Sequence, residues 1–219
     1  MAGYFLRYFN KTLKKDLLIC NTSDLTSISE SLFEISKPNR GGVSFYHSPT
    51  IEDINKAELS FIFSCKCFAN EEFNFIVARS SEMENKNKAL VPVKKTMPTA
   101  YKKGPDLHYD LCGLNRSQSD DLFVVLVEEL KKEYGHVVLS DDALYRVICD
   151  AISNDEVDFN YYKKSKITAL SELDSICSKN NVKCRKLKNR LSQLLKETSN
   201  SYNQLVCQID NDVSGWESE

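Results

Sequence analysis

The spacing of apolar residues changes along this chain, from strand-like near the N-terminus to helical toward the C-terminus. Residues 4–9 and 43–47 are short runs rich in aromatic residues, which favours strands. Between these runs we expect a short helix, capped by Ser23 or Asp24. Its apolar residues recur at helical spacing: Leu25, Ile28, Leu32 and Ile35.

The clearest strand pattern lies between residues 59 and 78. Larger apolar side chains alternate with other residues over 59–68, a turn follows at 69–71, and alternation resumes over 73–78. This pattern predicts a β-hairpin, and helices on one side of an antiparallel sheet fit it best. Four aromatic residues should lie on or near the core face: Phe61, Phe63, Phe73 and Phe75.

Residues 81–106 differ from their surroundings. The segment begins polar and is then interrupted by Pro92, Pro98 and Pro105. Proline removes a hydrogen-bond donor from a strand, so a central strand is not expected here. We predict a mobile excursion rich in lysine and proline.

The apolar period becomes helical from Ser119 onward. It predicts four helices, over 119–134, 141–152, 167–179 and 183–197, with a frayed acidic tail over 200–219. The expected class is α+β, in which an N-terminal, mostly antiparallel sheet with one or two short helices precedes a C-terminal helical bundle. We divide the chain into a sheet domain (1–116), a helical region that can pack on the sheet as one domain (117–199) and the tail.

The composition favours a globular protein that stays in the cytoplasm. Of 219 residues, 42% are hydrophobic and 27% charged, which are ordinary proportions. The N-terminus lacks the layout of a secretion signal, and no apolar run is long enough to span a membrane. The eight cysteines are scattered without the paired spacing of zinc sites, so we expect free thiols and no metal.

Charge is distributed unevenly. Residues 119–158 hold eleven acidic residues against three basic ones, a net charge of −8. Residues 159–199 hold ten basic residues against three acidic ones, a net charge of +7, and 86–103 hold six lysines and no acid. Lysine outnumbers arginine and asparagine is abundant, a composition often found in genes of phages and mobile elements.

The densest basic cluster predicts contact with nucleic acid. Lys183, Lys186 and Arg190 share one face of the helix expected over 183–197, while leucines line its inner face. The helix at 167–179 and the break at 180–182 give the pair a helix-turn-helix character. The candidate binding residues are Lys179, Lys183, Arg185, Lys186, Lys188 and Arg190, together with Lys94, Lys95, Lys102 and Lys103 in the excursion.

Two other interpretations of the charges remain open. The acidic and basic segments can pair with each other within the fold. Alternatively, the acidic helices of 119–158 can dock on another protein, as in an inhibitor, an adaptor or a mimic of DNA. Contact with the nucleic-acid backbone predicts an affinity for DNA that falls steeply as the salt concentration rises, and neither alternative predicts this result.

Enzymatic function has the least support. His108 and Asp110 could align along one strand face, but no third residue completes a nucleophile, base and orienting group. The phosphate-binding loop pattern with a terminal lysine is absent, and the chain has seven glycines. We therefore expect a binding protein without a cofactor.

Overall fold

The computed structural model describes residues 3–9, 43–64 and 72–214, with the side chains of residues 141 and 201–214 left out. Its centre is an antiparallel six-stranded sheet in the order β4-β5-β2-β1-β3-β6. The strands are β1 (Tyr4–Phe9), β2 (Val43–Ser48), β3 (Phe73–Arg79), β4 (Val93–Lys94), β5 (His108–Leu111) and β6 (His136–Leu139). The helices are α3 (Ile54–Ile62), α4 (Ser80–Lys86), α5 (Arg116–Leu130), α6 (Asp141–Ser153), α7 (Ile167–Lys179) and α8 (Arg185–Ser214). This confirms the predicted α+β class.

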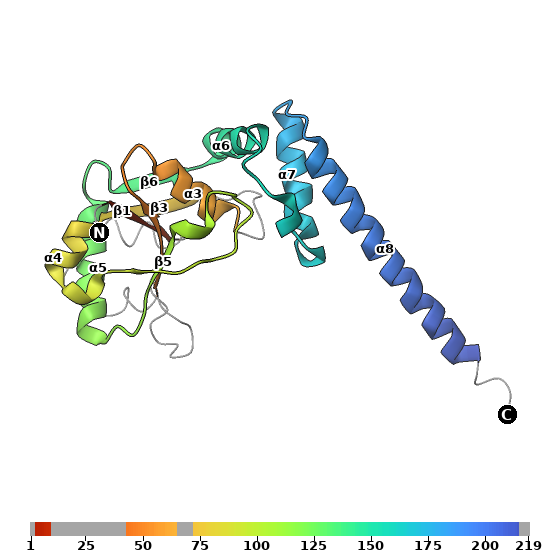
Figure 1. The fold of residues 1–219 in the computed structure, drawn as a ribbon, viewed down its shortest axis with the longest axis horizontal. Helices are drawn as coiled ribbons and strands as arrows, with labels where there is room; N and C mark the ends of the chain where they lie inside the picture. Colours follow the sequence, from red (N-terminus) through yellow and green to blue (C-terminus); the bar gives the residue numbers. More distant parts are fainter. Residues whose placement is uncertain (1–2, 10–42, 65–71, 215–219) are drawn as a thin grey trace.

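The alternation along β1 divides the core into two layers, one on each side of the sheet. Phe5 and Phe9 point to the side covered by α4 and α5, whereas Leu6 points to the opposite side. There one apolar cluster runs from Leu6 and its neighbours through α3 and α6 to α7 and the first half of α8. Figure 1 shows α4 and α5 grouped on one side of the sheet and α6, α7 and α8 on the other. Helices therefore cover both faces, and not one face as the sequence pattern suggested.

The predicted hairpin is wrong in its first strand. Residues 54–62 form helix α3, while β3 forms the expected second strand. Helical spacing is also present here, because Ile54, Ala57 and Ile62 are buried on α3. The apolar residues of this stretch fit helical spacing from Ile54 and alternation from Leu59, so alternation alone could not identify the element. The expected turn at 69–71 and the helix expected after Asp24 lie outside the described residues.

Residues 81–106 run along the edge of the sheet and contain short elements. After α4 the chain forms the single 3₁₀ turn η1 (Lys88–Leu90), and β4 then pairs with β5 at the edge of the sheet. A second 3₁₀ turn, η2 (Pro105–Leu107), leads into β5. As the prolines implied, no central strand forms in this segment. Its mobility stays a prediction.

The C-terminal helices follow the predicted pattern with shifted ends. Helix α5 begins at Arg116, because Asn115 and Gln118 form a reciprocal capping box, and it ends at Leu130. Strand β6, which was not predicted, follows Gly135. A Cβ atom at Gly135 would lie 1.6 Å from the carbonyl oxygen of Glu129, so only glycine fits this close approach.

Helices α6 and α7 lie where the sequence predicts them, and both end in the same way. Asp155 after α6 and Asn181 after α7 take the left-handed conformation, with φ angles of 57° and 58°. The next amide in each case donates back to the final helical turn, as Val182 does to the Cys177 carbonyl at 2.8 Å. Asn181 thus fills the role that glycine often fills in such a turn.

Helix α8 differs most from expectation. It begins at Arg185 rather than Lys183 and continues to Ser214, well beyond the predicted end at Glu197. Its backbone is therefore helical where a frayed tail was expected. Figure 1 shows α8 running back beside α7 and then extending away from the rest of the molecule. The two helices are antiparallel neighbours that contact each other. The helix-turn-helix character of the pair stays a prediction.

Candidate nucleic-acid interface

The ten predicted binding residues fall in three separate places on the fold. Lys94 and Lys95 lie on and just after β4, at the edge of the sheet. Lys102, Lys103, Lys186 and Arg190 lie where the excursion meets the base of α8. The last four surround the turn between α7 and α8: Lys179, Lys183, Arg185 and Lys188.

The lysines at the sheet edge are paired within the fold. Lys94 lies 3.0 Å from an Asp106 carboxylate oxygen, and Lys95 lies 2.9 Å from Asp110. The hydrogen bond to Asp110 raises the pKa of Lys95. Because Asp110 is buried, Lys95 neutralises a carboxylate that would otherwise be costly to the fold. These two lysines have a structural explanation.

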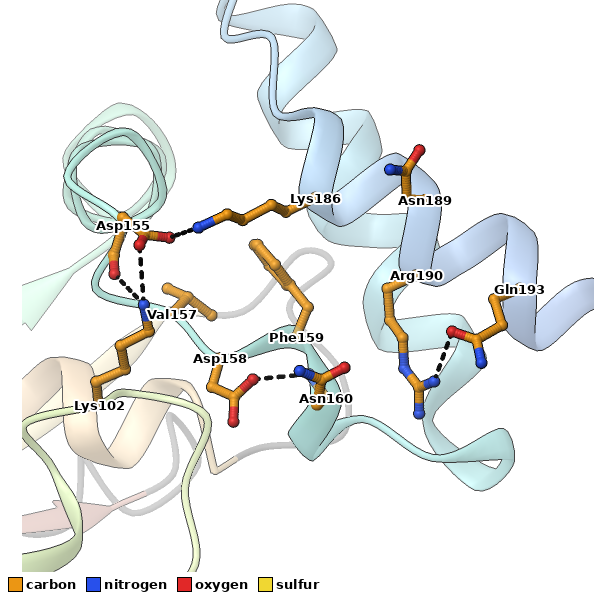
Figure 2. Close-up of a pocket in the computed structure, with 10 residues that line it drawn as sticks. All are labelled: Lys102, Asp155, Val157, Asp158, Phe159, Asn160, Lys186, Asn189, Arg190 and Gln193. Atoms are coloured by element: carbon orange, nitrogen blue, oxygen red, sulfur yellow. Dashed lines mark hydrogen bonds and ion pairs between the residues drawn. The ribbon is translucent and has the colours of Figure 1, made fainter.

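A polar pocket of about 400 Å³ separates the base of α8 from the loop after α6. Figure 2 shows Asp155 between two lysines, with Lys186 Nζ at 2.8 Å and Lys102 Nζ at 3.1 Å from its carboxylate oxygens. The hydrogen bonds from Lys186 and Lys102 lower the pKa of Asp155. Beside them, Lys103 pairs with Glu156. At this point the acidic and basic segments do pair with each other.

Arg190 does not belong to an outward basic face. Its side chain is half-buried, and its guanidinium donates to the Tyr162 carbonyl at 2.9 Å and to Gln193 Oε1 at 3.0 Å. Figure 2 shows Arg190 directed along the pocket wall toward Gln193. Arg190 therefore holds the base of α8 on the loop that contains Tyr162. The three residues expected to share one outward face therefore differ in their surroundings, since Lys183 precedes α8, Lys186 pairs with Asp155 and Arg190 is half-buried. Their part in binding nucleic acid stays a prediction.

The outward face of α8 is defined by its buried residues. Leu187 and Leu194 are buried and Leu191 is half-buried, which directs Arg185, Lys188 and Lys196 toward solvent. All three are exposed, as are Lys179 and Lys183 beside them. We call these five residues the hairpin cations: Lys179, Lys183, Arg185, Lys188 and Lys196. None of the five forms an ion pair with another residue in the described ranges.

Lys196 was missed in the sequence, although a signal was present. Arg185, Lys188, Ser192 and Lys196 follow one another at helical spacing on the polar side of the leucine stripe. The face that the sequence analysis predicted was centred on Lys186. That position lies about a quarter turn around the helix from Arg185, nearer to the buried leucines.

The start of α8 is electrostatically unusual. The N-terminus of a helix carries a partial positive charge, which favours acidic side chains. The first turn of α8 contains no acidic residue, and Arg185 and Lys186 are placed there with Lys183 just before it. Lys186 is balanced by Asp155, but Lys183 and Arg185 are not. Like charges gathered at this end weaken the helix, so helix stability does not account for them.

The acidic segment does not form one surface. Helix α5 packs on one side of the sheet and α6 on the other, so the acids of 119–158 are separated by the core. Glu129 is buried and accepts hydrogen bonds from Arg79 and Lys132. Asp121 accepts from Asn87 at 2.8 Å. This arrangement does not favour a continuous acidic docking face.

The side chains of His108 and Asp110 on β5 lie close together, but their arrangement with Ser44 is not that of a catalytic triad. His108 Nε2 lies 3.4 Å from Asp110 Oδ1, and the Ser44 hydroxyl donates to the same oxygen at 2.8 Å. The carboxylate therefore stands between hydroxyl and imidazole, whereas activation of a serine needs the imidazole next to the hydroxyl. Among the described residues, no cluster of three or more His, Cys, Asp or Glu side chains could hold a metal ion.

Comparisons of this chain with protein-family models, curated proteins and solved structures found no match. No helix among the described residues is both long and apolar enough to cross a membrane. The geometry of the chain itself is therefore the basis for any functional proposal.

Proposed function

We propose that this chain binds nucleic acid by contacting the phosphate backbone with the hairpin cations. The observation that carries the proposal is their placement: all five are exposed and have no carboxylate partner in the described chain, and Lys183 and Arg185 lie at the positive end of α8. A phosphodiester backbone supplies the negative charge that this surface lacks.

The shape of the hairpin supports contact with the backbone rather than base reading. Four of the five hairpin cations are lysines, which act as flexible point charges. They lie on the outer side of two antiparallel helices, and Figure 1 shows α8 extending away from the sheet. Such a surface can follow phosphates without entering a groove. We therefore expect little preference for sequence.

Replacing Arg185 and Lys188 together with alanine tests the proposal. Fluorescence anisotropy with a labelled random duplex, over a series of salt concentrations, measures affinity and its salt dependence. We expect the slope of log affinity against log salt to flatten by about 1.8, because each lost phosphate contact on duplex DNA removes about 0.9. Single-stranded DNA and RNA serve as further probes.

The matched control is the double variant Lys86→Ala with Lys88→Ala. Both lysines are exposed and lie away from the α7–α8 hairpin, Lys86 at the end of α4 and Lys88 at the start of η1. The control removes two positive charges, as the Arg185 and Lys188 variant does. The control should bind as the unaltered protein does, and both variants should show native melting curves. No affinity for any of the three probes at low salt, or equal loss in the control, overturns the proposal.

A further inference from the structure

A second pocket lies between α3, the turn after α5 and strand β6. Its volume is about 390 Å³, and it is lined by side chains from all three. None of the residues that line it belongs to α7 or α8. The walls are largely apolar, with Ile51, Ile54, Val137 and the ring of Tyr134. Tyr134 is 65% exposed, an unusual position for a large aromatic side chain.

The polar group of interest in this pocket is Glu58. Its residue is only 4% exposed, and it forms no hydrogen bond or ion pair with any described residue. Burial raises the pKa of Glu58 to about 7. Buried carboxyl groups are almost always paired, so an unpaired one on a pocket wall indicates a partner other than the described residues of the chain.

The charges around Glu58 define what that partner must be. Glu52 and Glu133 line the same pocket, and neither lysine nor arginine does. His136 also lines it, but its Nε2 lies 3.2 Å from the Asn74 side-chain oxygen. In the adjoining hollow, Arg79 and Lys132 both bind Glu129, so their charges are already compensated.

We propose that this pocket binds an alkylammonium group, with Glu58 as the counter-ion of the ammonium head and the apolar wall in contact with its stem. The head brings the positive charge that three glutamates favour, and the stem covers Ile54, Val137 and Tyr134. A free amine and a lysine side chain of another protein share this chemistry. The site is independent of the hairpin cations and stands whether or not nucleic acid binds.

Calorimetric titration with hexylammonium tests the site, with hexanol and hexanoate as neutral and anionic probes of the same length. We expect hexylammonium to bind and the other two to bind at least tenfold more weakly. Its affinity should rise roughly tenfold between about pH 6 and about pH 8, because Glu58 ionises over this range while an amine stays charged. The variant Glu58→Gln should lose both the binding and the pH dependence.

The control variant is Glu84→Gln, because Glu84 is exposed on α4 and outside the pocket. It should bind as the unaltered protein does. Nα-acetyl-lysine amide separates the two sources: binding at least as tight as that of hexylammonium identifies a lysine side chain, and its exclusion identifies a free amine. Absence of hexylammonium binding at pH 8, equal binding by Glu58→Gln, or equal binding of hexanol overturns the proposal.

Discussion

Two buried glutamates in this fold have pKa values that are shifted in opposite directions. Glu129 is 3% exposed and accepts hydrogen bonds from the Arg79 backbone and guanidinium, each at 3.2 Å, as well as from Lys132. Burial by itself would raise the pKa of Glu129, but these hydrogen bonds outweigh it and lower the pKa. Glu58 is equally buried and has no such donors, so burial alone acts on it.

The raised pKa of Glu58 makes stability depend on pH. The folded protein holds this proton more tightly than the unfolded chain, whose glutamates titrate near 4.5. The resulting stabilisation is fully present below about pH 4.5 and is lost as pH rises through about 7, by up to about 3 kcal/mol. The variant Glu58→Gln should therefore lack this part of the dependence of the unfolding free energy on pH.

Urea unfolding at pH 5 and pH 8, without any amine present, measures the effect. We expect the glutamine variant to lose less stability between these two values than the unaltered protein, and Glu84→Gln to behave as the unaltered protein. Identical pH profiles for all three proteins would show that Glu58 is ionised at no cost in the folded state.

At the scale of elements, α3 shows that burial is easier to predict than conformation. Phe63 was expected in the core as part of a strand, and it is fully buried although it follows a helix. Phe63 belongs to the core cluster against which Phe61 packs, and Phe61 itself stacks on Tyr8 and meets Phe73 and Phe75 edge-on. Apolar side chains can reach this core from a helix as well as from a strand.

Phe63→Ala should therefore destabilise the protein by about 3–5 kcal/mol, since the ring leaves a cavity in a core that cannot collapse fully. Thermal or urea unfolding measures this loss. The matched control is Val93→Ala on β4, where the side chain is 71% exposed and the change should stay within about 0.5 kcal/mol. A loss below about 1 kcal/mol at Phe63 would contradict its place in the core.

At the scale of the whole molecule, packing of α6 on α7 brings cysteines together without joining them. Cys149 and Cys177 are buried thiols outside any disulfide, and each influences the pKa of the other, whereas Cys112 is exposed and also outside any disulfide. Burial, followed by the nearby thiols, raises the pKa of Cys177 to about 12. A thiol with this pKa is almost entirely protonated at neutral pH and reacts slowly.

Reducing agent should leave the thermal midpoint unchanged, because we expect all eight thiols to be free. Labelling of the native protein should modify Cys112 much faster than Cys149 and Cys177. In denaturant without reductant all eight should react, and substantially fewer than eight reactive thiols would contradict the prediction.

The sequence alone determined the features that depend on neighbouring residues. Helices α6 and α7 lie within a residue or so of their predicted bounds, because apolar residues three and four apart define a helical face within one segment. The charge contrast between 119–158 and 159–199 was also visible without a structure.

Only the tertiary structure decided the features that depend on residues far apart in the chain. It made 54–62 a helix, covered both faces of the sheet, and left Glu58 buried without a partner among the described residues. It also divided the basic residues into paired and unpaired ones. Asp155 and Asp110 neutralise Lys186 and Lys95, whereas Arg185 is exposed and has no ion pair among the described residues. An ion pair needs two side chains within about 4 Å, and the fold, not local sequence, sets that distance.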